Sequence, residues 1–348
     1  MSNKIVYNFK NQNPDSFFRL YQPMLIILLI CGYDFDLIKK NILYTVTVKV
    51  YCCSLVVLVI YSSVVCCPQD LSQLWSLFEY SASVMLILIC QSRIESFFNT
   101  LMDIDSYLRI NRRYHIHTMY KLIISAIITW SVRLAYTCMY CHIYNCYDSL
   151  ILYAIRQFSL IALDFNRVWR CILFDTIRYR LKVLRIRLEE TPECNYYLYV
   201  KNNKSIKENK MKFCLYMYRS IADLVDLVSP ELHASIILFI FQEPVESLGY
   251  VIMHVVQISL LLFSPFLAVE FYSVEVEKIR LFLMHRLIDG DDPENKKDIE
   301  MFLRYTRIRT FTYRIWRIIP INLSLPLELI NLCVNYVIVV INFTHLYG

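Results

Sequence analysis

Long runs of apolar residues recur along the chain and are separated by polar, mostly basic connections. A helix needs about 20 apolar residues to cross a hydrocarbon core about 30 Å thick, and most of these runs approach that length. The pattern therefore predicts an all-α membrane protein with seven transmembrane helices, the fifth interrupted by Ser229–Pro230. The predicted spans are Leu43–Val65, Leu74–Phe97, Met119–Cys141, Leu150–Phe174, Ile221–Phe241, Tyr250–Val269 and Leu327–Phe343.

Two stretches between the sixth and seventh spans have the pattern of helices outside the membrane. The sixth helix continues with mixed charges to Ile288 and stops at Asp289–Gly290. A second helix, Glu294–Ile319, follows capping acids and interleaves aromatic with basic residues. Its apolar side requires a partner, either the membrane surface or a cytoplasmic bundle shared with the basic connection 175–219. We favour the bundle, and expect residues 273–320 to form a helical anchor region.

The last apolar run carries its polar residues on one side. At about 100° per residue, Asn331, Asn335 and Asn342 fall within roughly 40° on the helix surface. Glu328 and Ile338 lie close to the same line. An amide that faces hydrocarbon without a partner is costly, so this stripe faces either other helices or water. The choice between these two environments is the main functional question about the chain.

Composition supports a membrane protein and argues against several other classes. The 348 residues are 57% hydrophobic and 19% charged, with a mean hydropathy of +0.42, which is unusual for a soluble domain. Only four glycines are present, which argues against Gly-rich phosphate loops and against a β-barrel with tight turns. Residues Met1–Gln22 are polar and the run Leu25–Ile30 is too short to span, so we expect no signal peptide.

The 13 cysteines lie mostly within apolar runs, where cysteine behaves as a small hydrophobic residue. Their spacing predicts no zinc framework. Five of them gather near one predicted membrane face, where a disulfide and free thiols are both open alternatives. These are Cys66, Cys67, Cys138, Cys141 and Cys146.

The distribution of basic residues predicts the orientation. Apart from Lys49, Arg133 and Arg156, all of the 36 Lys and Arg lie in the segment 1–42 or in and beside the connections after the second, fourth and sixth spans. Cytoplasmic connections are enriched in Lys and Arg, so the N-terminus is predicted inside and the C-terminus outside. This orientation is the reverse of a G-protein-coupled receptor. The net charge of +6 then reflects topology and some contact with anionic lipid, and no nucleic-acid partner is expected.

No constellation of residues predicts an enzyme. His115 and His117 form a His-x-His on a basic loop without acid or Cys partners, so a solvated loop is favoured over a metal site. The sequence has no phosphate-binding loop, nucleophile elbow or HExxH helix. A secondary transporter is the alternative from another class, but such folds often contain internal repeats, and none is found. We therefore expect no catalysis, no bound metal and no cofactor.

Three ionisable residues fall at similar depth in the outer half of the predicted bundle. Glu79, Arg133 and Arg156 lie about two turns or less from the outer ends of the second, third and fourth spans. Charges inside a membrane are costly, and we weigh two explanations equally: a structural ion pair between helices, and a ligand pocket open to the outside. Asp164 lies deeper and is expected to be a structural polar group. The pocket would also include the side chains of Tyr80, Trp130, Tyr136, Tyr140, Tyr153, His254 and Gln257.

The end of the chain resembles the insect gustatory receptors. Their last helix ends with Thr-Tyr, five apolar residues and Gln-Phe. Here Asn335–Tyr336, Val337–Ile341 and Asn342–Phe343 keep that spacing, with Asn in place of both Thr and Gln. Ser324–Leu327 also resembles members from moths and butterflies. The motif stands at the end of a seven-span, N-inside chain of suitable length, so the resemblance extends to the whole architecture.

This resemblance implies a ligand-gated, non-selective cation channel in the plasma membrane of sensory neurons. It implies a homo- or heterotetramer, related in fold to odorant receptors, with the pore formed by residues 321–348. By position, Val339 would be a constriction, Asn342 would replace the pore Gln, and Phe343 would close the motif, with Asn335 and Tyr336 before them. Ligand would enter from outside into the bundle 43–272. We expect a bitter plant compound, with a sugar or an odorant-like ligand as the alternatives.

Overall fold

A computed structural model covers the chain, and it describes most of the helical regions. The described backbone comprises residues 14–34, 42–66, 71–108, 110, 112–144, 150–189, 196–199, 205–208, 210–240, 248–289, 293–309, 314–315 and 319–320, together with residues 324, 328, 331, 335, 338 and 339. Side chains are described for a smaller set, chiefly within 21–34, 42–62, 76–89, 93–108, 116–135, 157–189, 211–227, 269–289 and 295–309.

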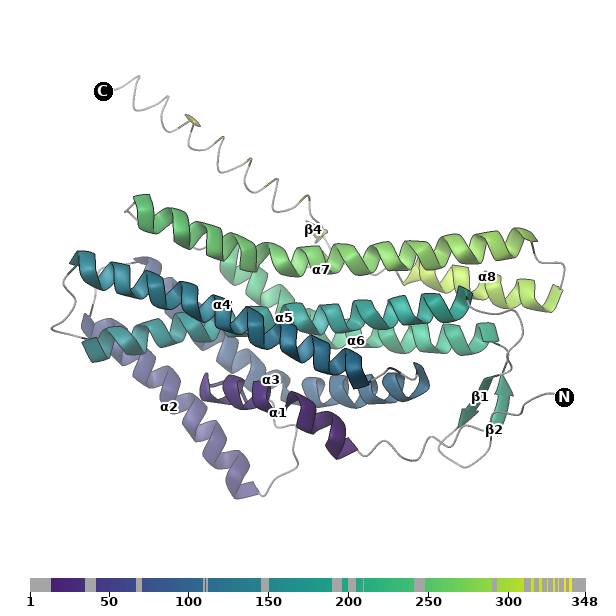
Figure 1. Ribbon diagram of the computed structural model, residues 1–348, viewed down its shortest axis with the longest axis horizontal. Coiled ribbons are helices and arrows are strands. Elements are labelled where there is room, and N and C mark those ends of the chain that lie inside the picture. Colours follow the sequence, from purple (N-terminus) through teal and green to yellow (C-terminus); the bar gives the residue numbers. More distant parts are fainter. Residues whose placement is uncertain are drawn as a thin grey trace.

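The described chain is a helical bundle with two short antiparallel hairpins (Figure 1). The helices are α1 Pro14–Ile30, α2 Ile42–Cys66, α3 Leu71–Leu108, α4 Arg112–Tyr144, α5 Leu150–Glu189, α6 Lys210–Ile240, α7 Leu248–Asp289 and α8 Pro293–Ile308. The hairpins pair β1 Tyr196–Tyr199 with β2 Ser205–Glu208, and β3 Arg314–Ile315 with β4 Ile319–Pro320.

Three long helices form the centre of the bundle. Figure 1 shows α5, α6 and α7 running side by side, with α8 against the end of α7 and α6. α3 packs along both α5 and α6, and it is bent by 63° between Ser76–Ile89 and Arg93–Leu108. The central position of α5 lets side chains on its different faces reach α3, α4 and α7.

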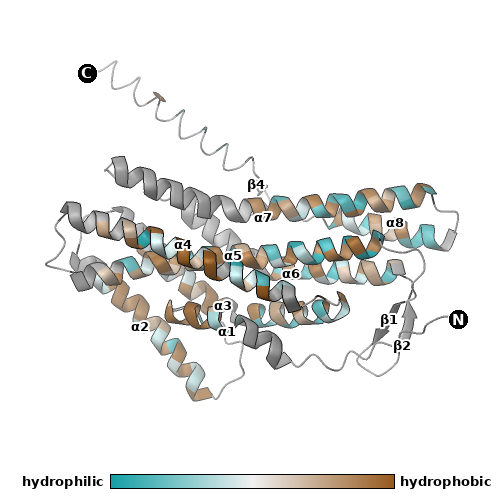
Figure 2. Ribbon diagram, in the orientation of Figure 1, coloured by the Kyte–Doolittle hydropathy of each residue, from teal (hydrophilic) through white to brown (hydrophobic). Residues whose placement is uncertain are grey.

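One half of the bundle is apolar on its outside and the other half is mixed. Figure 2 shows mostly brown residues along α2, and alternating teal and brown along the far ends of α5 to α8. Ile42, Val50 and Val57 of α2 are exposed, as expected for a helix that contacts lipid. Within the described residues, Ile42–Ser62 and Ile116–Ala135 are long and apolar enough to cross a membrane, and the bent pair in α3 makes a third candidate. The chain is therefore helical with two or three candidate spans, and the other predicted spans are not tested.

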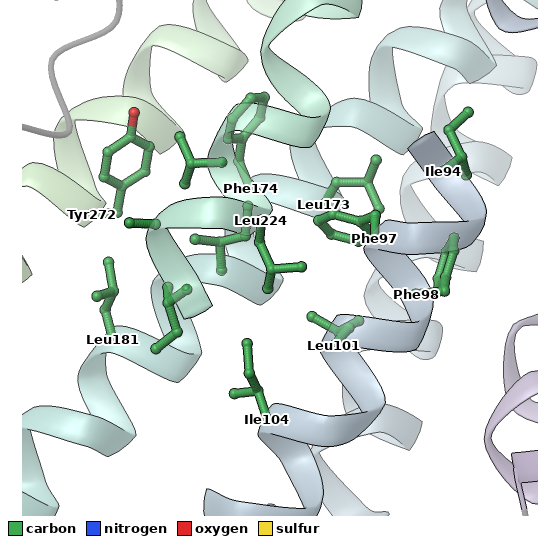
Figure 3. Close-up of a cluster of buried hydrophobic side chains, with 14 of the residues drawn as sticks. Ile94, Phe97, Phe98, Leu101, Ile104, Leu173, Phe174, Leu181, Leu224 and Tyr272 are labelled. Atoms are coloured by element: carbon green, nitrogen blue, oxygen red, sulfur yellow. The ribbon is translucent and has the colours of Figure 1, made fainter. Parts of the chain in front are cut away.

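The mixed half contains a large part of the hydrophobic core. Side chains from four helices point toward one another in Figure 3, and all of them are buried. The labelled residues are Ile94, Phe97, Phe98, Leu101 and Ile104 of α3, Leu173, Phe174 and Leu181 of α5, Leu224 of α6 and Tyr272 of α7. Burying each such side chain contributes about 1.5–3 kcal/mol where water is the alternative environment. This core therefore fixes how the far ends of the helices pack.

Helix α1 is the main element that hydropathy missed. Its apolar part, Tyr21–Ile30, is too short to span and contains Pro23, yet Tyr21, Met24 and Leu28 are buried against the bundle. The predicted N-terminal segment 1–42 therefore contains a packed helix. Its amphipathic spacing was a usable signal, because buried positions recur every three or four residues.

Gly32 ends α1 in a left-handed conformation. Its φ of 87° is accompanied by hydrogen bonds from the Tyr33 N–H to the Leu28 carbonyl at 2.9 Å and from its own N–H to the Leu29 carbonyl at 2.9 Å. This pattern is a Schellman cap, in which glycine is preferred. A Cβ at Gly32 would lie 2.8 Å from the Tyr80 hydroxyl oxygen, so close packing adds a second reason for glycine.

The structure also changes two predictions about the fourth and fifth spans. Pro230 lies inside α6, so the predicted interruption at Ser229–Pro230 is wrong. The predicted connection 175–219 is largely helical, because α5 continues to Glu189 and α6 already begins at Lys210.

The predicted helix Glu294–Ile319 exists only as far as Ile308. α8 buries Ile299, Phe302 and Leu303, and packs on α6 and α7, as a helix within a bundle would. Beyond it, β3 and β4 form a tight hairpin, so the prediction of helix to Ile319 is wrong.

Candidate functional site: ion pairs that join α5 to its neighbours

Helix α5 carries the side chains that connect the bundle electrostatically. Asp164 and Arg167 lie one turn apart in its first half, and Arg180 and Arg185 lie in its second half. All four make ion pairs, and each set reaches at least one other helix. The arrangement therefore has two levels, one near the apolar half and one in the mixed half.

The first level is a chain of four charges. Arg167 Nη2 donates to both carboxylate oxygens of Glu79 on α3, at 2.7 and 2.8 Å. Arg133 on α4 donates from Nε to Asp164 Oδ2 at 2.6 Å and from Nη2 to Oδ1 at 3.3 Å. Arg167 Nη1 lies 3.5 Å from Asp164 Oδ1 and joins the two pairs. Paired Arg–carboxylate contacts of this kind fix geometry as well as charge.

These four charged side chains are almost completely inaccessible to solvent. The side chains of Arg133, Glu79 and Asp164 are 1%, 2% and 0% exposed, and that of Arg167 is 12% exposed. Breaking a buried pair is costly because one charge is then left without its partner. The network therefore fixes the positions of α3, α4 and α5 relative to one another.

Sequence reasoning grouped two of these residues but assigned their partners differently. Glu79 and Arg133 were expected to pair with each other or to line a pocket together with Arg156, whereas each pairs with a residue of α5. Asp164 was expected at the inner end, and it is a central member. The two ionisable residues Asp164 and Arg167 at helical spacing within an apolar run were the signal that pointed to it.

Two predicted pocket aromatics lie apart from this network. Tyr80 donates its hydroxyl to the Cys31 carbonyl at 2.9 Å and meets the ring of Tyr33 edge to face at 6.1 Å. Trp130 is 55% exposed on the outside of α4, with an edge contact to Phe165 at 6.0 Å. The side chains of Tyr136, Tyr140, Tyr153, Arg156, His254 and Gln257 lie outside the described part of the structure.

The second level joins α5 to α3 and α7. Arg180, fully buried, donates to Asp105 Oδ2 at 2.6 Å and to the Thr176 carbonyl at 2.6 Å. Burial acts to lower the pKa of Arg180, but Asp105, Tyr21 and Tyr114 together outweigh it, so the pKa is raised and the guanidinium stays charged. The Tyr114 and Tyr179 rings stack beside this pair, with centroids 3.4 Å apart.

Glu275 on α7 receives two cations. Arg185 donates from Nε to Glu275 Oε2 at 2.8 Å, and Lys278 lies 3.2 Å from Oε1. Burial acts to raise the pKa of Glu275, but these hydrogen bonds outweigh it and lower the pKa. The carboxylate is thus charged at neutral pH and fixes α5 to α7.

A third group of contacts lies where α8 ends. Arg309 donates to Asp223 Oδ1 of α6 at 2.6 Å and to the Tyr305 hydroxyl at 2.9 Å, and it also pairs with Asp226. Arg280 of α7 donates to the Thr306 carbonyl. These carboxylates are exposed, so solvent screens the pairs.

The described residues of the predicted pore-forming segment 321–348 are helical and exposed. They are Ser324, Glu328, Asn331, Asn335, Ile338 and Val339. Of the predicted pore positions, Asn335 and Val339 are thus on an exposed face, while Tyr336, Asn342 and Phe343 lie outside the described residues. Of the cysteines considered for a disulfide, Cys138 is a free thiol, and the side chains of the other four are likewise not described.

Comparison with known proteins gives a match in structure but none in sequence. No family model matches the chain, and no curated protein matches it. The structure of the olfactory receptor OR5 from the insect Machilis hrabei, solved in complex with eugenol, is similar with a TM-score of 0.56. The match covers 95% of this chain and 99% of that receptor at 12% sequence identity. The chain therefore has the fold of an insect olfactory receptor over nearly its whole length.

Proposed function

We propose that the chain is a subunit of a chemosensory receptor that acts as a ligand-gated, non-selective cation channel. The observation that carries this proposal is the shared fold with an insect olfactory receptor along nearly the full length of both chains. The apolar outside of α2 and the candidate spans support a location in the plasma membrane. The gustatory type is supported by the motif at residues 335–343.

In this proposal four copies, identical or mixed with other receptor subunits, surround an axis formed by their last helices. Asn335 and Val339 would face the conduction path, followed by Asn342. Support comes from the exposure of a helical face that carries amides, Ile338 and Val339, because a single chain leaves this face uncovered. Seven spans with the N-terminus inside then place the end of this helix at the outer surface.

The ion pairs suggest a division of roles in the ligand-binding bundle. Glu79 and Arg133 already use their charged groups on Arg167 and Asp164, so we assign them to positioning rather than to ligand contact. Trp130, Tyr136, Tyr153, Arg156, His254 and Gln257 remain the proposed ligand contacts. The ligand opens the channel only if it binds the open form more tightly than the closed form.

Bitter plant compounds are the proposed ligands, by resemblance to gustatory receptors. One observation favours an odorant-like ligand as the second candidate: the similar olfactory receptor was solved with eugenol, a small aromatic molecule. Sugars would be recognised mainly through hydrogen bonds, whereas the proposed contacts include Trp130 and several tyrosines. The two classes of ligand can be compared directly in one assay.

Expression in oocytes with a panel of plant metabolites, small aromatics and sugars tests the proposal. We expect a ligand-evoked current from cells that display the protein, and a label attached after Gly348 that reacts without permeabilisation. Ligand-dependent uptake that saturates without a channel conductance would instead indicate a secondary transporter. Surface-displayed protein that gives neither current nor uptake with any ligand would refute the channel.

Individual residues can be tested in the same cells. Asn342→Leu should change the reversal potential if that side chain lines the pore. Arg156→Ala should lower ligand sensitivity at unchanged surface expression if Arg156 contacts ligand. Reduced surface expression with normal sensitivity would assign Arg156 to structure.

A further inference from the structure

Glu328 is an isolated charge on the last helix. It is the only Asp, Glu, Lys or Arg after Arg317, and it lies within the apolar run 327–343. Its side chain is exposed, and none of the described cationic side chains lies within ion-pair distance of it. The proposed function gives no role to this carboxylate.

The neighbours of Glu328 on the helix surface are polar. At about 100° per residue, Ser324, Glu328, Asn331 and Asn335 fall within about 60° of one another, and all four are helical and exposed. One turn further the same face becomes apolar, with Ile338 and Val339. The face thus has a charged and amide-bearing first half and an apolar second half.

Around an axis formed only by copies of the last helix, an exposed carboxylate has three possible surroundings, and two of them conflict with the sequence. Hydrocarbon is excluded by the cost of a charge and three polar neighbours facing lipid. A cation on an adjacent copy of the same helix is excluded because residues 318–348 contain no Lys or Arg. Water with mobile cations remains, and carboxylate oxygens are ligands that hard cations prefer.

We propose that the Glu328 carboxylates of the assembled subunits form a ring that concentrates permeant cations at one mouth of the pore. This inference rests on the proposed function, because it needs several copies of the last helix around one axis. Glu328 precedes Asn342 by 14 residues, which is about 21 Å along a helix. With the C-terminus outside, the ring lies at the cytoplasmic mouth, far from the proposed constriction at Val339.

A ring of this kind has a defined electrical consequence. Negative charges in a confined mouth raise the local concentration of cations by about tenfold or more, and exclude anions. Screening shortens their reach to about 8 Å at 0.15 M salt, so the effect is largest in dilute solution. Glu328 therefore sets conductance and the preference for cations over anions, whereas gating is determined elsewhere.

The test is ligand-evoked recording from membrane patches containing the full-length channel, with Glu328→Gln and Glu328→Asp. In Glu328→Gln we expect single-channel conductance to fall by up to about tenfold in dilute KCl and less at high salt. The reversal potential in a KCl gradient should move toward that of chloride, and block by Mg²⁺ from the cytoplasmic side should weaken. Glu328→Asp keeps the charge and should remain near the wild type.

Glu300→Gln is the matched control, because it removes an exposed carboxylate from α8, outside the polar face. It should leave conductance and reversal potential unchanged. Unchanged conductance and reversal potential in Glu328→Gln, with a normal ligand-evoked current, would overturn the ring and leave the channel intact. Failure of the wild type to conduct would overturn both.

Co-expression covers the case in which Glu328→Gln does not assemble alone. Mixed with wild-type subunits, it should give discrete intermediate conductances, because partial rings carry fewer charges. If the variant co-purifies with the wild type but every channel has the wild-type conductance, Glu328 does not face the ion path.

Discussion

The two halves of the bundle contain the same types of ion pair, arginine with a carboxylate, in different physical settings. Around Glu79, Arg133, Asp164 and Arg167, the outward faces of the neighbouring helices are apolar, and the ion pairs are sealed inside. In the other half the Arg180–Asp105 pair is also buried, but the carboxylates around Arg309 are exposed, and a hydrophobic core holds the helices together there.

This difference follows from the solvent on the outside. Between helices in lipid there is no hydrophobic driving force, because lipid chains are as apolar as leucine, so packing and polar contacts must select the partners. In water the burial of Phe174 and its neighbours selects the packing partners, and exposed ion pairs contribute only about 0–1 kcal/mol each. We therefore expect buried ion pairs to contribute most to the stability of the first half, and hydrophobic packing to contribute most to the stability of the second.

The largest effect is expected from Asp164→Ala. It removes the carboxylate of Arg133 in a buried setting, where the loss of one partner costs about 3–5 kcal/mol. We expect a strongly reduced melting temperature in detergent and little protein at the cell surface. The control Asp175→Ala removes only a half-exposed partner 3.7 Å from Arg178 and should be nearly neutral. If the two variants melt alike, the buried network does not hold the apolar half together.

Phe174→Ala tests the second half with an effect of similar or slightly smaller size. Truncating a fully buried aromatic side chain leaves a cavity and costs about 3–5 kcal/mol. Phe271→Ala on α7 is a matched aromatic control, because that ring is half exposed. Melting curves of both variants in detergent give the comparison. Equal losses would mean that the core beside α5 is loosely packed.

An intermediate effect is expected at the end of α1. Gly32→Ala places a Cβ 2.8 Å from the Tyr80 hydroxyl oxygen at a φ of 87°. Strain of this kind costs about 1–3 kcal/mol. Adding Tyr80→Phe to the same protein removes the clashing oxygen and should restore part of the melting temperature. No recovery in the double variant would assign the whole loss to the backbone.

The smallest effect is expected from Arg309→Gln. Its pairs with Asp223 and Asp226 are exposed, so thermal stability should change by about 1 kcal/mol or less, and less still at high salt. The melting temperature at low and high salt checks this. A loss comparable with that of Asp164→Ala would contradict the contrast between the two halves.

Hydropathy predicted most helices well because it depends on residues within one helix. The predicted span Leu43–Val65 agrees closely with α2, and the continuation of the sixth helix to about Ile288 agrees with α7. The prediction was wrong at Pro230, because α6 continues through this proline. It was also wrong beyond Ile308, because the chain forms a hairpin after α8.

The partners of the charged residues were harder to predict than their burial. The cost of an intramembrane charge identified Glu79 and Arg133 as residues that need partners. The residue of α5 that each one contacts depends on the relative height and rotation of neighbouring helices. Residue spacing within one helix does not reveal either quantity. Depth counted from helix ends put Asp164 deeper than Arg133, and so did not predict the pair that these two residues form.

The bend in α3 restricts which rearrangements the protein can undergo while its ion pairs hold. Glu79 and Asp105 of α3 lie 26 residues apart, about 39 Å along a straight helix, whereas their partners Arg167 and Arg180 lie 13 residues, about 20 Å, apart on α5. The 63° bend shortens the distance between the two ends of α3, which brings both carboxylates closer to their partners on α5. A motion that straightens α3 would therefore stretch both ion pairs at once, so the bend and the two pairs stabilise the same arrangement of α3 on α5.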